Sequence, residues 1–137
     1  MSLKIKRIII DTNLWISFLI TNDFKKLDQF LDSDKYQIVF SEELFNEFLE
    51  VVHREKFNRY FNDLNIKILI EIINDKALFV KVISIVNECR DLKDNFLLSL
   101  AIDGDVDYLI TGDNDLLSLK HFEKTSILTI NDFISTL

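Results

Sequence analysis

The chain of 137 residues contains no proline, two glycines and one cysteine. Its turns must therefore be built mainly from Asn, Asp and Ser. A single cysteine excludes an intramolecular disulfide framework and favours a cytoplasmic location. Two histidines are too few for a typical zinc site. No apolar run approaches the ~20 residues of a membrane span, and the basic start precedes too short an apolar run for a signal peptide.

Positive charge is also scarce, because 16 Lys and Arg residues stand against 23 Asp and Glu residues, a net charge of −7. This balance argues against a simple nucleic-acid-binding module, whose affinity comes largely from neutralised phosphates. The acids are clustered, however, and carboxylates that hold divalent cations make a surface far less negative than its formal charge. A metal-dependent nuclease is therefore not excluded.

The chain has ample material for a hydrophobic core, since 48% of its residues are hydrophobic and twelve are Phe. We expect residues 1–137 to form a single domain. Apolar strands alternate with helical patterns, which predicts a three-layer α/β/α sandwich around a parallel sheet of about five strands. The expected strands are 7–10, 36–40, one within 79–85, 107–111 and 126–130. The expected helices are 14–20, 23–31, 42–53, 66–78, 94–102, 116–119 and 131–137.

The stretch Arg7–Asn13 organises this prediction. Its three isoleucines form the β-branched, wholly apolar run that is typical of a strand buried on both faces. The run ends in Asp11, and Thr12 or Asn13 can cap the helix that follows. Ligands of open α/β sheets bind at the carboxyl ends of strands, and a charge there costs free energy unless a cation or donors compensate it. We therefore interpret Asp11 as a metal ligand.

A second pair of carboxylates follows the apolar strand at 108–110. Asp113 and Asp115 come directly after it, in the run Thr-Gly-Asp-Asn-Asp. Gly112 lets the backbone turn tightly there, or approach a ligand closely. These acids therefore map to the same edge of the sheet as the end of the first strand.

Two more acids come from helices near this edge. Asp94 shares a helix face with Leu98 and Ala101, so we expect its side chain to point inward. Glu47 lies at the margin of the apolar stripe of the helix that Ser41 caps. Ligands that are all oxygen atoms favour a hard cation such as Mg²⁺ or Mn²⁺ over zinc.

Each acid also has a structural explanation. Asp94 could simply cap a helix, and Glu47 could be a solvated residue at a helix edge. Asp113 and Asp115 could form turns. Asp11 is the hardest to explain in this way, because the interior of a sheet offers it few partners. The joint pattern is more specific than any of its members.

Four motifs, taken in order, resemble those of the PIN domain. They are Asp11-Thr12-Asn13 after an apolar strand, Ser41 with Glu47, Arg90-Asp91-Leu92-Lys93-Asp94-Asn95, and Thr111-Gly112-Asp113-Asn114-Asp115-Leu116-Leu117. The chain looks most similar to VapC-like ribonucleases, the toxin components of type II toxin–antitoxin pairs, over essentially its whole length. Leu92 and Ile130 stand where this group often has proline, at positions that carry no chemistry.

The resemblance implies a sheet of order 3-2-1-4-5, with Asp11 and Asp113 on adjacent strands. It implies catalytic and metal-binding roles for Asp11, Glu47, Asp94 and Asp113, an auxiliary metal-binding role for Asp115, and supporting roles for Asn13, Ser41 and Thr111. The expected activity is Mg²⁺- or Mn²⁺-dependent hydrolysis of RNA by in-line attack of an activated water, leaving 5′-phosphate and 3′-hydroxyl ends. The expected partners are an antitoxin protein and a second copy of the chain.

The clearest basic patch is His53–Tyr60, where cations alternate with aromatics. Arg54, Lys56 and Arg59 could track an RNA backbone while the aromatics stack on bases. Alternatively, the stretch is a solvated helix end with its aromatics packed inward.

The cysteine, the histidines and the tryptophan are further candidates. Cys89 has no evident His and Asn or Asp partners, so we interpret it as a small buried residue and not as a nucleophile. We expect His53 and His121 to lie outside the acidic edge. Trp15 belongs either to the core or to a dimer interface.

Two rival functions remain open at this stage. A Mg²⁺-dependent phosphotransfer protein or phosphatase also uses Asp at strand ends, but Asn13 stands where a dehalogenase-like site has its second Asp. A receiver domain has its acidic pair after the first strand, whereas this chain has it after the strand at 108–110. A catalytically silent PIN-like interaction module is the other rival, and the intact acids argue against it.

Overall fold

The isoleucine run forms the central strand of the sheet. β1 (Lys6–Ile10) lies between β2 (Tyr36–Phe40) and β4 (Tyr108–Ile110) and is parallel to both. Ile8, Ile9 and Ile10 are at most 1% exposed, as expected for a strand covered on both faces. The computed structural model describes residues 4–21, 34–54 and 63–136.

The described sheet has six strands in the order β3-β2-β1-β4-β6-β5. Five of them are parallel and follow the predicted order. The expectation of a purely parallel sheet is wrong at one edge, where β5 (His121–Phe122) pairs antiparallel with β6 (Thr125–Leu128). A strand of two residues is too short to be recognised from the alternation of apolar and polar residues. The strand expected within 79–85 is also misplaced, because β3 (Leu78–Phe79) shares only Phe79 with that stretch.

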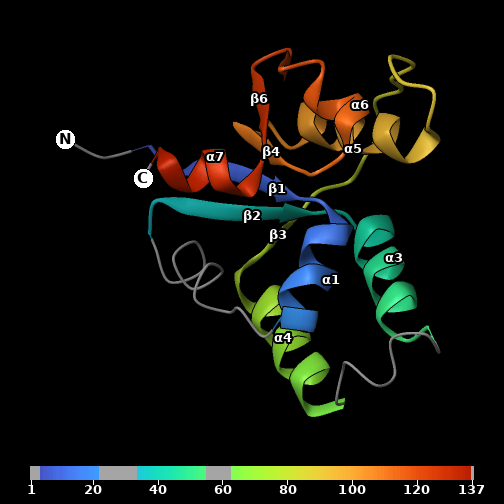
Figure 1. Cartoon of the computed structure of the whole chain (residues 1–137), viewed down its shortest axis with the longest axis vertical. Helices are drawn as coiled ribbons and strands as arrows, with labels where there is room; N and C mark the ends of the chain where they lie inside the picture. The colour runs from blue at the N-terminus through green and yellow to red at the C-terminus, as the bar shows by residue number, and fades with distance from the viewer. Residues whose placement is uncertain (1–3, 22–33, 55–62, 137) are drawn as a thin grey trace.

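Helices cover the sheet from two sides. In Figure 1, α1, α3 and α4 lie on one side of the strands and α5 and α6 on the other, as the layered architecture predicts. The helix expected at 23–31 lies outside the described residues. Within the described ranges, no helix has both the length and the apolar character that crossing a membrane requires. The helices are α1 (Thr12–Thr21), α3 (Glu42–Val52), α4 (Asp63–Lys76), α5 (Leu92–Asp103), α6 (Asn114–Leu117) and α7 (Ile130–Ser135).

The single tryptophan lies in the core. Trp15 is fully buried, and its ring centroid lies 5.8 Å from that of Phe40 and 6.4 Å from that of Phe48. These contacts pack α1 against both β2 and α3. Of the two alternatives for Trp15, the core position is therefore correct.

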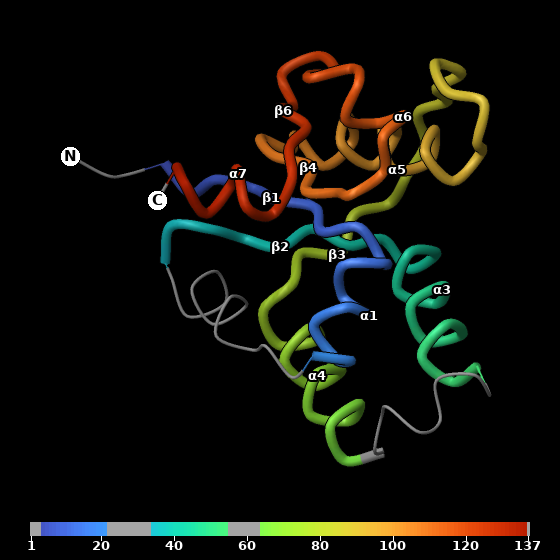
Figure 2. Tube along the Cα trace, in the orientation of Figure 1, coloured from blue at the N-terminus to red at the C-terminus, as the bar shows by residue number. Residues whose placement is uncertain are grey.

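The segment between β3 and α5 carries the chain from one face of the sheet to the other. Figure 2 shows this segment passing from the side of α4 to the side of α5. Asp103, at the carboxyl end of α5, accepts hydrogen bonds from the backbone nitrogens of Ile83 (2.6 Å) and Ser84 (2.8 Å). This anchor fixes the path along which the chain arrives at the first turn of α5.

Candidate metal centre

β1 and β4 end side by side, and a hydroxyl group joins their ends. The backbone nitrogen of Asp11 donates to the carbonyl of Ile110 at 3.0 Å, which continues the pairing of the two strands. The fully buried Thr111 donates from Oγ1 to Oδ2 of Asp11 at 2.8 Å. The same Oγ1 accepts a hydrogen bond of 3.0 Å from the backbone nitrogen of Asp113. Thr111 therefore orients the acid of one strand and the backbone of the next acid together.

The first turn of α5 brings Asp94 to the same place. Asp91 is the N-cap residue, and its Oδ1 accepts from the backbone nitrogen of Lys93 at 2.8 Å. Asp94 is 5% exposed and shares its buried face with Leu98 and Ala101, as predicted. α5 begins at Leu92, two residues before the expected start, so the explanation of Asp94 as the cap of this helix is wrong.

Asn95 fixes the loop that leads into α5. Its side chain accepts a 2.7 Å hydrogen bond from the backbone nitrogen of Cys89 and donates a 2.9 Å bond to the carbonyl of the same residue. Asn95 is buried, and both bonds are partly shielded from water. They hold the chain just before the N-cap, and thereby set where Asp94 projects.

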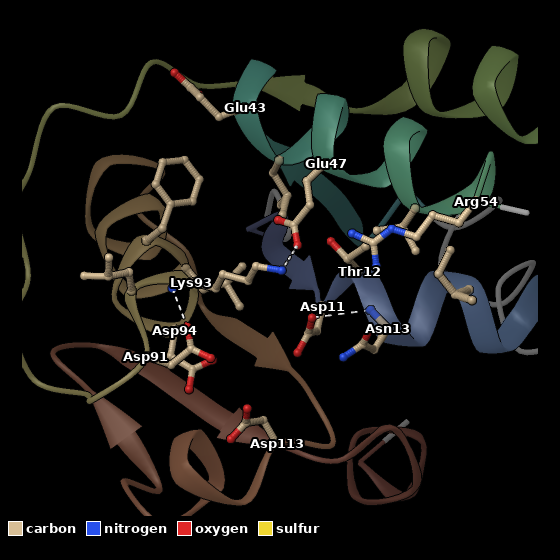
Figure 3. Close-up of a pocket in the computed structure, with 16 residues that line it drawn as sticks. Asp11, Thr12, Asn13, Glu43, Glu47, Arg54, Asp91, Lys93, Asp94 and Asp113 are labelled. Atoms are coloured by element: carbon tan, nitrogen blue, oxygen red, sulfur yellow. Dashed lines mark hydrogen bonds and ion pairs between the residues drawn. The ribbon is translucent and has the colours of Figure 1, made fainter. Parts of the chain in front are cut away.

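The carboxylates converge in one pocket. Asp94, Asp113 and Asp115 each offer an oxygen, and these oxygens lie within 4.8 Å of one another. Figure 3 shows Asp11, Asp94 and Asp113 pointing into a common pocket, which has a volume of about 390 Å³. Glu47 enters this pocket from α3, on the opposite wall. Four of the five acids predicted to bind metal, Asp11, Glu47, Asp94 and Asp113, therefore line one cavity, whereas Asp115 does not line it. Asp11 and Glu47 are not part of the group of three close oxygens.

The electrostatics of the pocket favour a cation. Burial raises the pKa of Asp94 to about 6, with help from the negative charges of Asp113, Asp91, Asp11 and Asp115. Burial also raises the pKa of Asp11, against the opposing effect of the hydrogen bond from Thr111. Oδ2 of Asp94 is buried and has no hydrogen-bond partner among the described residues. An unpartnered buried oxygen among crowded carboxylates fits a hard divalent cation such as Mg²⁺ or Mn²⁺.

A comparison with protein families agrees with this geometry. The family model of the PIN domain matches residues 7–115, which include every acid of the pocket. The chain belongs to the PIN domain family. PIN domains are typically nucleases that use divalent metal ions, and this PIN domain has an acidic cluster at the carboxyl ends of β1 and β4. A search of the curated proteins finds no match to the chain.

The residues predicted to support the PIN site act in different ways. Asn13 lines the pocket, and its backbone nitrogen donates to Oδ1 of Asp11 at 3.4 Å. Ser41 does not line the pocket; its buried hydroxyl accepts from the backbone nitrogen of Leu44 at 3.0 Å and caps α3. Ser41 thus supports the helix that carries Glu47.

The turn after β4 differs from one of its predicted explanations. Gly112 does not have a positive φ, so this turn does not require glycine. An added Cβ at Gly112 would meet no atom within 4 Å, which leaves space for a ligand to approach. Asp113 caps α6 with Oδ1, which accepts from the backbone nitrogens of Asp115 at 2.8 Å and Leu116 at 3.4 Å. The role of turn former is therefore correct for Asp113, in addition to its place in the cluster.

The outer residues of the site are exposed. Asp115 forms an ion pair with Arg90 at 3.5 Å. Arg54, just after the end of α3, lines the pocket and pairs with Glu50 of that helix at 3.3 Å. Lys56 and Arg59, the other predicted RNA-binding residues, lie outside the described residues.

The remaining candidates do not contribute ligands to the pocket. His53 and His121 are both exposed, and neither lines the pocket, as expected. The thiol of Cys89 is partly buried, and burial together with the charges of Asp94, Asp115 and other nearby acids raises its pKa. A raised pKa suppresses the reactive thiolate, which agrees with a structural role.

Three further residues of this PIN domain matter to the site but carried no role in the sequence-based prediction. They are Asp91, which caps α5, Asn95, which holds the preceding loop, and Lys93, whose Nζ lies 3.4 Å from Oε1 of Glu47. A signal for Asn95 existed, since a polar residue in an apolar helical stretch requires a partner. No pattern indicates the partner of Lys93, because Glu47 lies on a different helix.

Proposed function

We propose that this PIN domain is a Mg²⁺- or Mn²⁺-dependent endoribonuclease. The observation that carries the proposal is the buried, unpartnered Oδ2 of Asp94 in the pocket that Asp11 and Asp113 also enter. Asp91 already caps α5, so Asp94 is not needed for that purpose. A carboxylate that is buried among other carboxylates destabilises the protein unless a cation neutralises it. We therefore infer that this group of acids serves to bind a metal ion.

Asp11, Asp94 and Asp113 would hold the cation, with Glu47 and Asp115 at its periphery. When bound, a divalent ion lowers the pKa of a water molecule and offsets negative charge on the phosphate during attack. Thr111 keeps Asp11 in one orientation through their 2.8 Å hydrogen bond. Oδ1 of Asp113 is occupied by backbone nitrogens of α6, which leaves Oδ2 for the pocket.

The substrate we propose is RNA. A phosphodiester is repelled by the free carboxylates, so the same cation that neutralises them also admits the substrate. Lys93 and Arg54 are the cations among the described lining residues, and they lie near the walls formed by α5 and α3. They provide positive charge for phosphates on either side of the cleaved bond.

Cleavage of defined oligonucleotides tests this function. The purified protein is incubated with an RNA and a DNA of the same sequence, in Mg²⁺, Mn²⁺ or EDTA. We expect RNA cleavage with either metal, none in EDTA, and products with 5′-phosphate and 3′-hydroxyl ends. Asp11→Asn and Asp94→Asn should abolish cleavage, whereas Asp75→Asn, at an exposed site on α4, should not.

The same preparation separates the alternatives. Cleavage of DNA but not RNA would overturn the proposed substrate. A rise in melting temperature with Mn²⁺, lost in Asp94→Asn, without cleavage of either nucleic acid would favour a catalytically silent interaction module. Absence of any Mn²⁺ effect on the melting of the wild type would argue against the metal site itself.

We also propose that the protein is the toxin of a type II toxin–antitoxin pair, with an antitoxin partner, and that it forms a homodimer. The likeness of the four sequence motifs to VapC-like proteins supports these proposals. Expression of the wild type should arrest bacterial growth, whereas Asp94→Asn at equal abundance should not. A small open reading frame beside the gene should encode a protein that relieves the arrest. Light scattering of the purified protein tests the dimer.

A further inference from the structure

Lys93 occupies an unfavourable place for a cation. It is the second residue of α5, directly after Asp91 and Leu92. The amino end of a helix carries partial positive charge, which favours Asp91 and Asp94 there and disfavours lysine. The helix itself therefore gives no reason for a lysine at this position, and its side chain must be explained by what it reaches.

That side chain extends across the pocket. Nζ of Lys93 lies 3.4 Å from Oε1 of Glu47, so the pair connects α5 on one wall with α3 on the other. Figure 3 shows Lys93 pointing into the pocket toward Glu47. The amino group thus contacts the peripheral acid of the site, in the pocket that Asp11, Asp94 and Asp113 also line.

The pair is suited to exchange. The side chains of Lys93 and Glu47 are 67% and 31% exposed, and ion pairs with this degree of exposure are weak. Lysine also has a long, flexible stem, so Nζ can move by several ångströms without any change in the backbone. A divalent cation is the stronger partner for Glu47 and would release the lysine.

The charges around the pocket indicate which anion Lys93 would bind after it leaves Glu47. The other cation among the described lining residues, Arg54, lies just after α3 and is already paired with Glu50 of that helix. Once a divalent ion neutralises the acids, a released ammonium group stands at the mouth of a pocket that must receive a phosphodiester. A phosphate oxygen is then the anion most available to it, and lysine binds phosphate as a point charge.

We propose that Lys93 positions the substrate: it pairs with Glu47 in the metal-free pocket, and it transfers to a phosphate of the bound nucleic acid when a divalent cation takes Glu47. This inference rests on the proposed nuclease function. It makes Lys93 an internal counter-ion that competes with the metal and assists the substrate. Removal of Lys93 should therefore strengthen the binding of metal and weaken the binding of nucleic acid. An ion pair with a merely structural role would not produce these opposite changes.

The test compares Lys93→Met, Lys93→Arg and a matched control, Lys67→Met, which removes an exposed lysine of α4 that does not line the pocket. Calorimetric titration with Mn²⁺ should give a Kd about two- to fivefold lower for Lys93→Met than for the wild type, the effect of removing one weak competing pair. Lys67→Met should match the wild type in this titration.

RNA cleavage kinetics at saturating Mn²⁺ give the second readout. KM should rise about tenfold in Lys93→Met while kcat changes less than about threefold, because one phosphate contact is lost in the ground state and the transition state alike. The dependence of log KM on log salt should become shallower by about 0.7, the value for one phosphate contact on a single strand. Lys93→Arg should restore most of the affinity for RNA.

The outcomes separate this inference from the nuclease proposal. If the wild type cleaves RNA but Lys93→Met keeps its KM and its Mn²⁺ affinity, the role of Lys93 is wrong and the nuclease stands. Weaker Mn²⁺ binding in Lys93→Met would also overturn it, because Lys93 would then be holding Glu47 in place for the metal. If the wild type cleaves neither RNA nor DNA, both the nuclease and the transfer to phosphate are overturned, and the Mn²⁺ titration still decides whether Lys93 competes with metal.

Discussion

Thr111 and Asp11 lie 100 residues apart in the chain, and the threonine hydroxyl donates a 2.8 Å hydrogen bond to Oδ2 of the aspartate. This bond depends on the register of β1 and β4, in which Ile10 pairs with Ile110. The same hydroxyl accepts from the backbone nitrogen of Asp113. One buried side chain thereby sets the geometry of two acids of the candidate metal centre.

Replacing Thr111 by valine tests this relationship. Thr111→Val keeps the shape of the side chain but removes the donor to Asp11 and the acceptor for Asp113. We expect Mn²⁺ affinity to fall about tenfold or more, as when groups that orient metal ligands are removed. Thr111→Ser, which keeps the hydroxyl, is the control, and both variants are measured by calorimetry. An unchanged Mn²⁺ affinity in Thr111→Val would contradict the orienting role.

Asp94 gives the metal-free protein a distinctive dependence on pH. Its pKa rises from 3.8 to about 6 on folding, so between these values the folded state binds more protons than the unfolded state. Its contribution to stability is therefore greatest below pH 4 and is lost as the pH rises through 6.

Asp94→Asn should remove the stability loss that ionisation of Asp94 causes at higher pH. In EDTA at pH 7.5 we expect the variant to be about 1–3 kcal/mol more stable than the wild type, with the difference shrinking toward pH 4. Urea unfolding followed by the fluorescence of Trp15, the single tryptophan, measures both proteins. Mn²⁺ should stabilise only the wild type. If the variant is less stable than the wild type at pH 7.5, ionised Asp94 does not destabilise the folded protein.

The two hydrogen bonds between the side chain of Asn95 and the backbone of Cys89 should contribute strongly to stability. Asn95→Ala removes the two hydrogen bonds that its partly buried side-chain amide makes to the backbone nitrogen and carbonyl of Cys89. We expect a loss of about 2–3 kcal/mol in the free energy of unfolding, measured in urea. Asn74→Ala, at an exposed position in α4, should change stability by less than about 0.5 kcal/mol. Equal stabilities of the two variants would show that the hydrogen bonds of Asn95 do not stabilise the fold.

Replacement by alanine should destabilise the protein at one of its two glycines and have no effect at the other. At Gly104, an added Cβ would lie 2.9 Å from the carbonyl oxygen of Leu100 and 3.0 Å from Cγ1 of Val39. Gly104→Ala should therefore lower the free energy of unfolding by about 1–3 kcal/mol in urea. At Gly112 nothing lies within 4 Å, and φ is not positive, so Gly112→Ala should be neutral. Loss of stability in Gly112→Ala alone would contradict this account.

Much of the fold could be predicted because its signals are local. The apolar strands and the helices with one buried face follow from the spacing of hydrophobic residues. The segments that escaped prediction are those whose structure depends on neighbours. Residues 80–85 are rich in the β-branched residues typical of a strand, yet the strand ends at Phe79. The backbone nitrogens of Ile83 and Ser84 bond to the side chain of Asp103 instead. β5 exists only because β6 is beside it.

The sequence by itself determined that β1 is a buried central strand ending in an acid, because an isoleucine run admits few other structures. It also placed Asp113 after a strand and Asp94 on a buried helix face. Only the tertiary structure decided which groups complete the site: the hydroxyl of Thr111 on Asp11, and the ammonium of Lys93 on Glu47. Such partners depend on strand register and on the reach of side chains between separate elements, and neither is encoded in the spacing of residues along one element.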